Sequence, residues 1–386
     1  MKKKILSAAL SLVMALTAFT GCAGSDSPSE GTVSSAETQS GTESAVVTSA
    51  PDEASATLLP ITLPPKEEDS AADSQAEEAP AHITPLMWEL TTDDGVKLTM
   101  IGAMHAVRED CYPLPEIIKK AYEEADVLAV ECDVTTATEN FSLQIEQLKN
   151  TYYSGGDTIE NHIDKEIIEK AIEFGKEYGV DLSLYKNCKP WVWMALLEQL
   201  VINEKDFDGT LGIDVRFANM AHDEGKEIFE LESADYQMKL IMNYSDKVCS
   251  TLIKDYTVEN KQKLSDELES IYTAWKVGDA ERFLIDAYPE KKQEAAKAQG
   301  LEISEEDMEA LEEYAKETVY DRNLGMRDKI KELLAGGKKN IFLTVGTDHF
   351  VGEKGIIALL EAEGYTVKQI MPEPAESTES SGEKAA

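Results

Sequence analysis

Two segments far apart in the chain share one pattern: an apolar run, then a glycine, then a histidine three residues after that glycine. The first is KLTMIGAMH, residues 97–105, and the second is NIFLTVGTDHFVGEKG, residues 340–355. A short apolar run that ends at a glycine predicts a buried strand followed by a turn. Ligands bind at the carboxyl ends of strands in open α/β sheets. The repeat therefore predicts an α/β fold in which His105 and His349 meet at one ligand.

The sequence around these motifs alternates between strand and helix patterns. Residues 87–90 and 97–101 flank an Asp-Asp-Gly turn and predict a hairpin. After His105, the helical spacing of apolar residues in PLPEIIKKAYEEA and the apolar run DVLAVECD complete a strand, helix, strand unit. A further helix is predicted to stop at Gly225. We expect a mixed, largely parallel central sheet flanked by helices.

Two stretches are predicted to be helical without adding to the sheet. Residues 236–318 are rich in Glu and Lys and have a helical pattern, so we expect a helical insertion packed beside the sheet. The run PWVWMALLEQLV is apolar on all sides but only about a dozen residues long, which favours a buried helix over a membrane span. Trp191 and Trp193 in this run are interpreted as packing residues.

The two ends of the chain predict export and a tether. Residues 1–22 have three lysines, an apolar run and then Phe-Thr-Gly-Cys22, which resembles a bacterial lipobox. Lipidation of Cys22 would anchor the protein to the outer face of the bacterial cell membrane. Ordinary secretion is the alternative, because Phe19 stands where such motifs usually have Leu. Residues 23–84 are acidic, lack aromatic side chains and predict a disordered Ser/Thr/Pro-rich tether; residues 373–386 predict a disordered tail.

Charge and cysteine usage exclude some classes of protein. A net charge of −37 argues against nucleic acid as a partner and against electrostatic binding to an anionic surface. No cysteine pair has CxxC spacing, so a structural zinc site or a dense set of disulfides is not expected. One disulfide in an exported protein remains open among Cys111, Cys132, Cys188 and Cys249. We expect Cys132 in the core, on the opposite strand face from Glu131.

Polar side chains follow four of the predicted strands. They are His105, Glu131 with Asp133, Glu232, and His349 with Asp348. Two histidines with one or two carboxylates can hold a divalent metal that lowers the pKa of a bound water, while a spare carboxylate moves the proton. Glu131 lies in an apolar run and must be paired if it is buried. A paired histidine and glutamate could also act as base and orienter without a metal.

Several other polar residues have more than one interpretation. Asp214 follows Gly212 near a helix start, where an N-cap role is at least as plausible as a ligand role. Arg322 could hold a substrate carboxylate, support Glu131, or be an ordinary charge on a helix surface. The remaining histidines, His82, His162 and His222, are predicted to be surface residues.

An ordered set of short motifs lies within residues 85–372, the part of the chain that we expect to fold as one α/β domain. They are Gly102-Ala-Met-His105, Val130-Glu131, Gly212-Ile-Asp214, Leu231-Glu232-Ser233, Arg322-Asn323 and Gly346-Thr-Asp-His349-Phe-Val-Gly352-Glu-Lys-Gly355, closed by GYTVKQI. This set resembles the TraB/PrgY/GumN family. The second histidine block with its trailing glycines is the most specific part. The first block has Ala103 where the family often has Thr, so a hydrogen bond from that hydroxyl is absent.

The resemblance implies a fold similar to the erythromycin-esterase and ChaN-like proteins and kinship with Tiki proteins, which are membrane-tethered, metal-dependent peptidases. Other relatives shut down peptide pheromone signalling. The resemblance places His105 and His349 as the paired histidines, Glu131 as the glutamate and Arg322 as the arginine of the family.

We therefore expect a membrane-anchored extracellular hydrolase, with a peptide or protein as substrate and Mn, Co or Zn as a divalent cofactor. His105, His349, Glu131 and Asp214 are the expected ligands, and His105, His349, Glu131, Glu232 and Arg322 the expected catalytic residues. Two alternatives remain: an esterase-type hydrolase that uses His and Glu without a metal, and a lipoprotein that binds a peptide or haem without chemistry.

Overall fold

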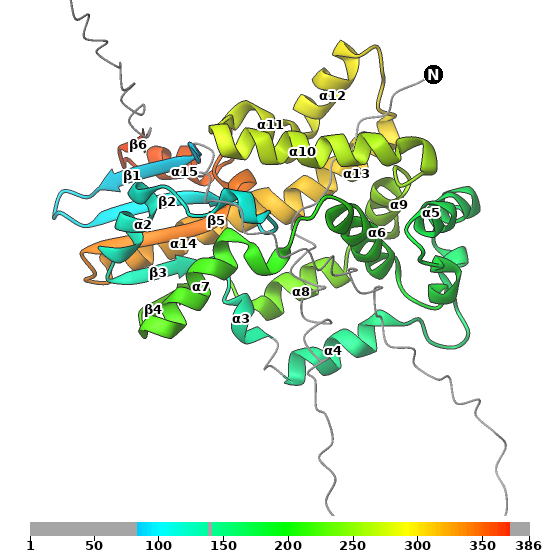
Figure 1. Cartoon of the computed structure of the whole chain (residues 1–386), viewed down its shortest axis with the longest axis horizontal. Helices are drawn as coiled ribbons and strands as arrows, with labels where there is room; N and C mark the ends of the chain where they lie inside the picture. Colours follow the sequence, from blue (N-terminus) through cyan, green and yellow to red (C-terminus); the bar gives the residue numbers. More distant parts are fainter. Residues whose placement is uncertain (1–82, 138–140, 371–386) are drawn as a thin grey trace, which may run out of the picture.

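A computed structural model describes residues 83–137 and 141–370, and Figure 1 shows a sheet at one end of the molecule and helices at the other. The sheet has six strands in the order β4-β3-β5-β2-β1-β6. Their bounds are β1 Met87–Thr91, β2 Lys97–Ala103, β3 Val127–Val130, β4 Glu227–Glu230, β5 Asn340–Gly346 and β6 Val367–Ile370. Strands β4, β3, β5 and β2 are parallel, and β1 is antiparallel to both β2 and β6. The predicted mixed, largely parallel sheet is confirmed.

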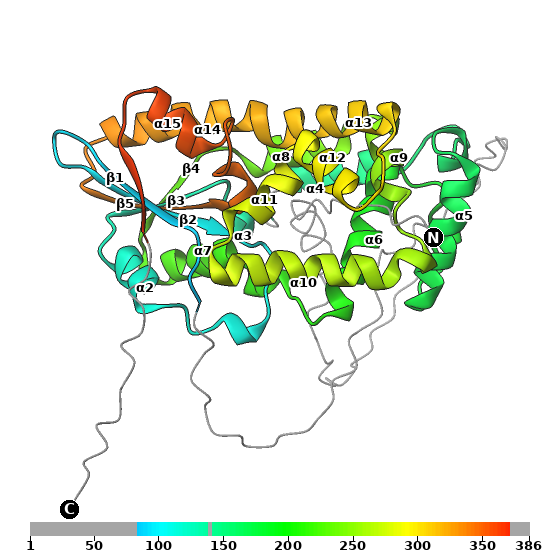
Figure 2. The same ribbon diagram turned by 90° about the horizontal axis from the view of Figure 1, so that it is seen from above.

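Helices cover both faces of this sheet. Figure 2 shows α14 and α15 on one face and α2 and α7 on the other. The α-helices longer than one turn are α2 Glu116–Glu123, α4 Phe141–Thr151, α5 Lys165–Glu177, α6 Pro190–Glu204, α7 Ile213–Glu224, α8 Ala234–Met242, α9 Asp246–Ile253, α10 Lys261–Val277, α11 Ala280–Ala287, α12 Pro289–Ala298, α13 Glu305–Ala315, α14 Asp321–Ala335 and α15 Ile356–Ala362. The one-turn helix α3 covers Val134–Ala137.

Local sequence accounts for several of these boundaries. The Asp-Asp-Gly turn joins β1 to β2, and Gly95 there has a φ of 86°, which a glycine adopts without strain. Helix α7 ends at Gly225, whose left-handed backbone lets its N–H bond to the carbonyls of Ala221 and His222. Helix α6 starts with Pro190 in its first turn, where the missing N–H has no cost.

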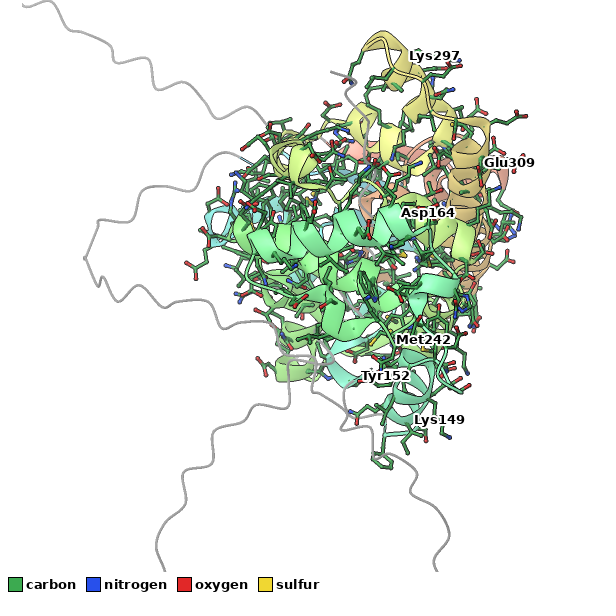
Figure 3. All side chains as sticks on the ribbon, turned by 90° about the vertical axis from the view of Figure 1, so that its right-hand side faces the viewer. Lys149, Tyr152, Asp164, Met242, Lys297 and Glu309 are labelled. Carbon is green, nitrogen blue, oxygen red and sulfur yellow. The ribbon has the colours of Figure 1, made fainter. Side chains whose placement is uncertain are left out.

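The helical half of the molecule is built from two separate stretches of the chain. Helices α4–α6 form one, and α8–α13 form the other, which matches the helical region expected over 236–318. Figure 3 shows this half end-on, with Asp164 before α5, Met242 at the end of α8 and Glu309 on α13. Helix α6 is buried inside this helical half. Its residues Trp191 and Trp193 are buried packing residues, as expected. Among the described residues, we find no helix with the length and apolarity that a membrane crossing requires.

The parallel strands bring their carboxyl ends to the same edge of the sheet, next to the helical half. The register pairs Ala103 of β2 with Gly346 of β5, and Val130 of β3 with Thr344 of β5 and Glu230 of β4. The residues that follow these strands therefore leave the sheet side by side. This edge is where the sequence predicts the site.

The four cysteines of the described region are free thiols in buried positions. The disulfide left open by the sequence is therefore absent between Cys111, Cys132, Cys188 and Cys249. The expectations for lipidation at Cys22, the tether of residues 23–84 and the tail of residues 373–386 concern stretches that lie outside the described residues, apart from residues 83 and 84.

Candidate active site

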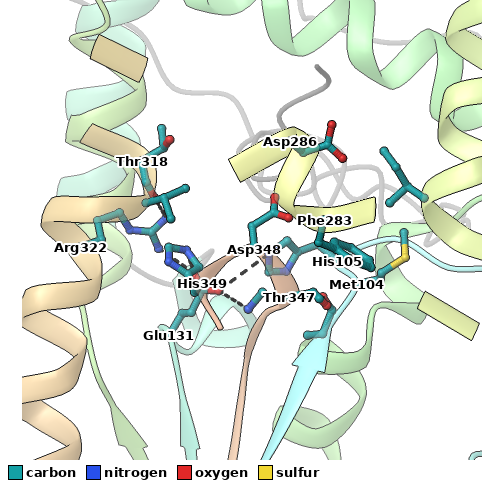
Figure 4. Close-up of a pocket in the computed structure, with 14 residues that line it drawn as sticks. Met104, His105, Glu131, Phe283, Asp286, Thr318, Arg322, Thr347, Asp348 and His349 are labelled. Carbon is teal, nitrogen blue, oxygen red and sulfur yellow. Dashed lines mark hydrogen bonds and ion pairs between the residues drawn. The ribbon is translucent and has the colours of Figure 1, made fainter. Parts of the chain in front are cut away.

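The two predicted histidines lie in the same pocket, on loops that follow neighbouring strands. His105 follows β2, and His349 closes the short 3-10 turn η8 (Thr347–His349) that follows β5. Figure 4 shows both imidazoles on the pocket wall with Glu131 below them. The two loops are joined directly, because the Thr347 hydroxyl donates a hydrogen bond of 2.9 Å to the carbonyl of Ala103. The two motifs therefore bring His105 and His349 together in one pocket, as the sequence predicts.

The glycines of the motifs make room for this approach. A Cβ on Gly346 would lie 3.0 Å from Glu131 Oε1 and 3.1 Å from His105 Nε2. A Cβ on Gly102 would lie 2.7 Å from the Thr347 hydroxyl. Further along, Gly352 packs against the ring of Tyr288, and Gly355 against the backbone of the loop before it. Gly102 and Gly346 are therefore required by close packing beside the histidines, and Gly352 and Gly355 by close packing of the loop that follows His349.

Helix α7 supplies the partner of His105. The Nδ1 atom of His105 lies 3.1 Å from Asp214 Oδ2, and since a carboxylate only accepts, Nδ1 carries the hydrogen. Gly212 is the N-cap of α7, so the N-cap interpretation of Asp214 is wrong and its side chain faces His105 instead. Burial opposes protonation of this imidazole, but Asp214 and then Glu131 outweigh it and raise the pKa of His105 to about 9.

Helix α14 supplies the partner of His349. The Nδ1 atom of His349 lies 2.6 Å from Asn323 Oδ1. The amide nitrogen of Asn323 donates to the carbonyl of Lys354, so its oxygen is the group that faces the imidazole. Burial and the nearby charge of Arg322 lower the pKa of His349 to about 3. His349 is therefore neutral at pH 7, with its hydrogen on Nδ1 and its Nε2 lone pair free.

Glu131 is the carboxylate between the histidines, and its own oxygens are already bonded. Oε1 accepts a 2.6 Å hydrogen bond from the N–H of Gly346, and Oε2 accepts from Arg322 at 2.6 Å and from Gln237 at 3.1 Å. Burial would raise the pKa of Glu131, but the charge of Arg322, and after it the charge of His105 and the hydrogen bond from Gly346, hold it far below its ordinary value. Glu131 is thus an ionised carboxylate fixed in place.

Arg322 holds Glu232 as well as Glu131. Its Nε and Nη2 lie 3.0 and 2.8 Å from Glu232 Oε2, and its Nη1 donates to the carbonyl of Thr318. That carbonyl belongs to the π-helical stretch η7 (Lys316–Tyr320), which links α13 to α14. Burial raises the pKa of Glu232, and Arg322 only partly offsets this. Of the three roles left open for Arg322, the geometry favours support of buried carboxylates.

The distances between the histidines and Glu131 are too long for hydrogen bonds. His105 Nε2 is 3.9 Å from Glu131 Oε1, and His349 Nε2 is 4.0 Å from Glu131 Oε2. A cationic His105 and a neutral His349 therefore face one ionised carboxylate across a small gap. Such a pair of imidazoles can donate a proton from one ring and accept a proton at the other.

The expected metal was tested against this donor set. Both imidazoles have Nδ1 tied to an oxygen, which leaves Nε2 facing the pocket, as in histidines that bind metals. Glu131 does not complete the set, because its oxygens already accept hydrogen bonds and Arg322 brings a positive charge beside them. Across residues 83–137 and 141–370, no three His, Cys, Asp or Glu side chains are arranged to hold an ion. The residues of this pocket therefore do not fit a metal held by three side chains.

Two further carboxylates line the same pocket. Asp348 lies in η8 beside His349, and Asp286 lies on α11 above it (Figure 4). Burial, followed by the charge of Asp286, raises the pKa of Asp348 to about 7. Burial likewise raises the pKa of Asp286. The cavity has a volume of about 40 Å³, enough for about three water molecules or one small end group.

The remaining histidines and Cys132 lie away from the pocket lining. His222 has a side chain that is 44% exposed and pairs with Asp133, and His162 is partly exposed between two aspartates. His82 lies outside the described residues. The Cys132 thiol is buried as expected and donates to Gln237, the residue that also donates to Glu131 and Glu232.

Three residues of the site carry no prediction from sequence. Gln237 and Asp286 lie in the helical region that was predicted only as an insertion, and no spacing signal distinguishes them from other polar residues of these helices. Asn323 follows Arg322 in the Arg322-Asn323 motif, and this adjacency is the one sequence signal that points to it; nothing in the sequence indicates its contact with His349.

Known proteins resemble this chain over most of its described length. The model of the TraB/PrgY/gumN family matches residues 86–369. A protein of Escherichia coli (strain K12) named "Uncharacterized protein YbaP" is 22% identical over 279 residues, which cover 72% of this chain and 93% of that protein. The protein of the same name from Shigella flexneri is 23% identical over 261 residues, covering 68% of this chain and 86% of that protein. No solved structure matches the chain.

Proposed function

We propose that this chain, which belongs to the TraB/PrgY/GumN family, is a hydrolase of peptide or other acyl bonds. The observation that carries the proposal is the meeting of His105 and His349 around Glu131 in one buried pocket. The Nε2 of His349 is placed to take a proton from water, because its Nδ1 is tied to Asn323. The Nε2 of His105 is placed to give a proton to the leaving group, because Asp214 favours its charged form.

Glu131 has a positioning role in this proposal. Its ionised carboxylate favours positive charge on either imidazole as protons move, and Arg322 and Gln237 keep it from shifting. Glu232 accepts a hydrogen bond from Arg322 and supplies the second negative charge beside its guanidinium group. A peptide or protein outside the cell is the proposed substrate, with Cys22 as a lipid anchor to the bacterial membrane.

In a metal-dependent version of this function, His105 and His349 would hold Mn, Co or Zn, which would lower the pKa of a bound water. Such a version requires Glu131 to exchange a hydrogen bond from Arg322 or Gln237 for the ion, or other ligands to complete the set. This version differs from the metal-free one in a measurable way, because a chelator abolishes activity only when an ion is required.

The experiment incubates the purified full chain with a defined peptide mixture and follows cleavage by mass spectrometry. It compares the wild type with His105→Ala, His349→Ala and the control His222→Ala, whose side chain is exposed. We expect the wild type and His222→Ala to cleave, and each of the other variants to lose at least about 100-fold in turnover.

Chelator and added ions decide between the two versions. Activity that ignores chelator supports the metal-free version. Activity that chelator removes and one ion restores, but not in His105→Ala or His349→Ala, supports the metal-dependent version. Saturable binding with every peptide intact, or binding of haem in a spectral titration without cleavage, would overturn the hydrolase and support a binding lipoprotein.

A further inference from the structure

Asp286 and Asp348 each have an oxygen that the fold leaves unsatisfied. Oδ1 of Asp286 and Oδ1 of Asp348 are buried and have no hydrogen-bond partner within the part of the chain that the structure describes. The Asp286 side chain is 6% exposed. Buried polar atoms in native proteins are nearly always satisfied, and an unpaired buried carboxylate is costly. These two oxygens therefore require a partner that the described residues do not supply.

Both carboxylates belong to the wall of the pocket that holds the two histidines. Asp348 is adjacent to His349 in the chain, and Asp286 approaches from α11, which packs on η8. Figure 4 shows the carboxylate of Asp348 pointing away from Glu131, toward the side where Asp286 lies. A group bound between the two aspartates would thus lie next to the proposed hydrolytic centre, on the side away from Arg322.

The described residues provide only part of the positive charge that this pair needs. Arg282 Nη1 lies 2.6 Å from Asp286 Oδ2, on the oxygen that is already satisfied. The second Arg282 nitrogen lies 3.4 Å from Glu267, so its charge is shared. Lys292 is buried nearby, where burial lowers its pKa to about 8 despite the charge of Asp286. Neither Arg282 nor Lys292 makes a hydrogen bond to either Oδ1 atom.

We infer that Asp286 and Asp348 form a subsite for a primary ammonium group of the substrate. An ammonium has three N–H donors in a compact group, which suits two carboxylate oxygens and a cavity of about 40 Å³. The described residues offer no third His, Cys, Asp or Glu that would make the pair a metal site. This inference rests on the proposed function, since it names the substrate class: a peptide that presents an α-amino end or a lysine side chain at the pocket.

A binding experiment tests the subsite without any turnover. Butylammonium is titrated into the full chain by calorimetry, with the neutral butanol as the matched probe. We expect butylammonium to bind and butanol not to, and Asp348→Asn to weaken butylammonium binding about 10-fold, as for loss of one charge-assisted hydrogen bond. The control Asp93→Asn makes the same change of charge in the exposed turn between β1 and β2 and should leave binding unchanged.

A second variant protects this test from a folding defect. If circular dichroism shows that Asp348→Asn is not folded, Asp286→Asn takes its place, with the same expected loss. Equal binding of butylammonium and butanol, or butylammonium binding that is unchanged in a folded variant, would overturn the subsite. Binding of neither probe would overturn it as well.

Peptide substrates then identify the source of the ammonium. If cleavage falls when the amino terminus is acetylated, the α-amino group occupies the subsite; if it falls when lysine is replaced by norleucine, the side chain does. Cleavage that ignores both changes overturns the subsite but leaves the hydrolase. Selective butylammonium binding without any cleavage leaves the subsite and overturns the hydrolase.

Discussion

The two Gly-x-x-His loops start from the same sequence pattern and arrive at opposite charge states. His105 has a carboxylate partner, Asp214, and a pKa raised to about 9, against burial. His349 has a neutral amide partner, Asn323, and a pKa lowered to about 3, chiefly by burial. The motif therefore places an imidazole, while a residue on a neighbouring helix decides whether that imidazole carries a proton.

The largest effect on stability is expected from the loss of Arg322, which holds the carboxylates beside both histidine loops. Arg322→Met leaves Glu131 and Glu232 buried without their cation, which should cost roughly 3–5 kcal/mol in the free energy of unfolding. Denaturant unfolding measures this. Arg327→Met on the same helix removes two ion pairs, with Asp328 and Glu363, that are more exposed, and should cost less than about 1 kcal/mol. Equal losses in the two variants would show that Arg322 does not hold the centre together.

Exchanging the partners should remove the difference between the loops. Asp214→Asn takes away the charge that keeps His105 protonated, and Asn323→Asp gives His349 a carboxylate that favours its protonated form. Each change should reduce turnover about 10- to 100-fold, the range for groups that orient catalytic histidines. NMR titration of the two imidazoles checks the cause, because the pKa of His105 should fall and that of His349 should rise. Unchanged titration would contradict the comparison.

The pH dependence of activity should follow from the charge states of the same two histidines. The proposed chemistry needs His349 neutral and His105 protonated, so activity should be flat around neutral pH, fall on the acid side toward about pH 3 and fall on the alkaline side near pH 9. In Asp214→Asn the alkaline limb should move to lower pH. An alkaline limb that does not move would assign it to another group.

Stability should respond to the two histidines with opposite signs. The raised pKa of His105 contributes stability that is complete below its ordinary value of 6.5 and is lost as pH rises through about 9. The lowered pKa of His349 contributes stability that is present above 6.5 and is lost as pH falls toward about 3. Melting temperatures of the wild type and of Asp214→Asn between pH 6.5 and 9 test the first statement, since the variant should lose less on the alkaline side.

The smallest effects are expected at the glycines of the two loops, and these too should differ. Gly346→Ala puts a methyl group against Glu131 and His105, so turnover should fall about 10-fold through displaced catalytic groups. Gly102→Ala pushes on Thr347 and should lower stability by roughly 1–3 kcal/mol. In the control Gly325→Ala on α14, the added methyl group would meet no atom within 4 Å. This variant should raise stability by up to about 1 kcal/mol. Identical behaviour of the two loop variants would contradict separate roles for the two turns.

The sequence predicts the strand ends well and the helix contacts poorly, for a physical reason. A buried strand followed by a glycine fixes where its next side chains emerge, and parallel pairing then places His105, Glu131 and His349 at one edge. The partners Gln237 and Asp286 come from helices, whose positions depend on packing between many side chains. A local pattern shows which face of such a helix is apolar but not which strand end it meets.

Glu131 and Asp214 show this division within the site itself. Burial of Glu131 inside an apolar run required a partner, and the sequence left Arg322 among the candidates; the ion pair is present. Asp214 near a helix start looked equally suited to an N-cap, since the local sequence is the same for either role. Only the approach of α7 to the β2 loop decides between them.

The π-helical stretch Lys316–Tyr320 couples the two halves of the molecule. Helices α13 and α14 run on either side of it as one long rod (Figure 2), and its extra residue sets where Arg322 and Asn323 point. Removing a single amino acid there would rotate one segment against the other by about 100°. Either α13 would lose its packing, or Arg322 and Asn323 would lose their contacts with Glu131 and His349. Related chains should therefore tolerate changes of residue type in this stretch far better than insertions or deletions.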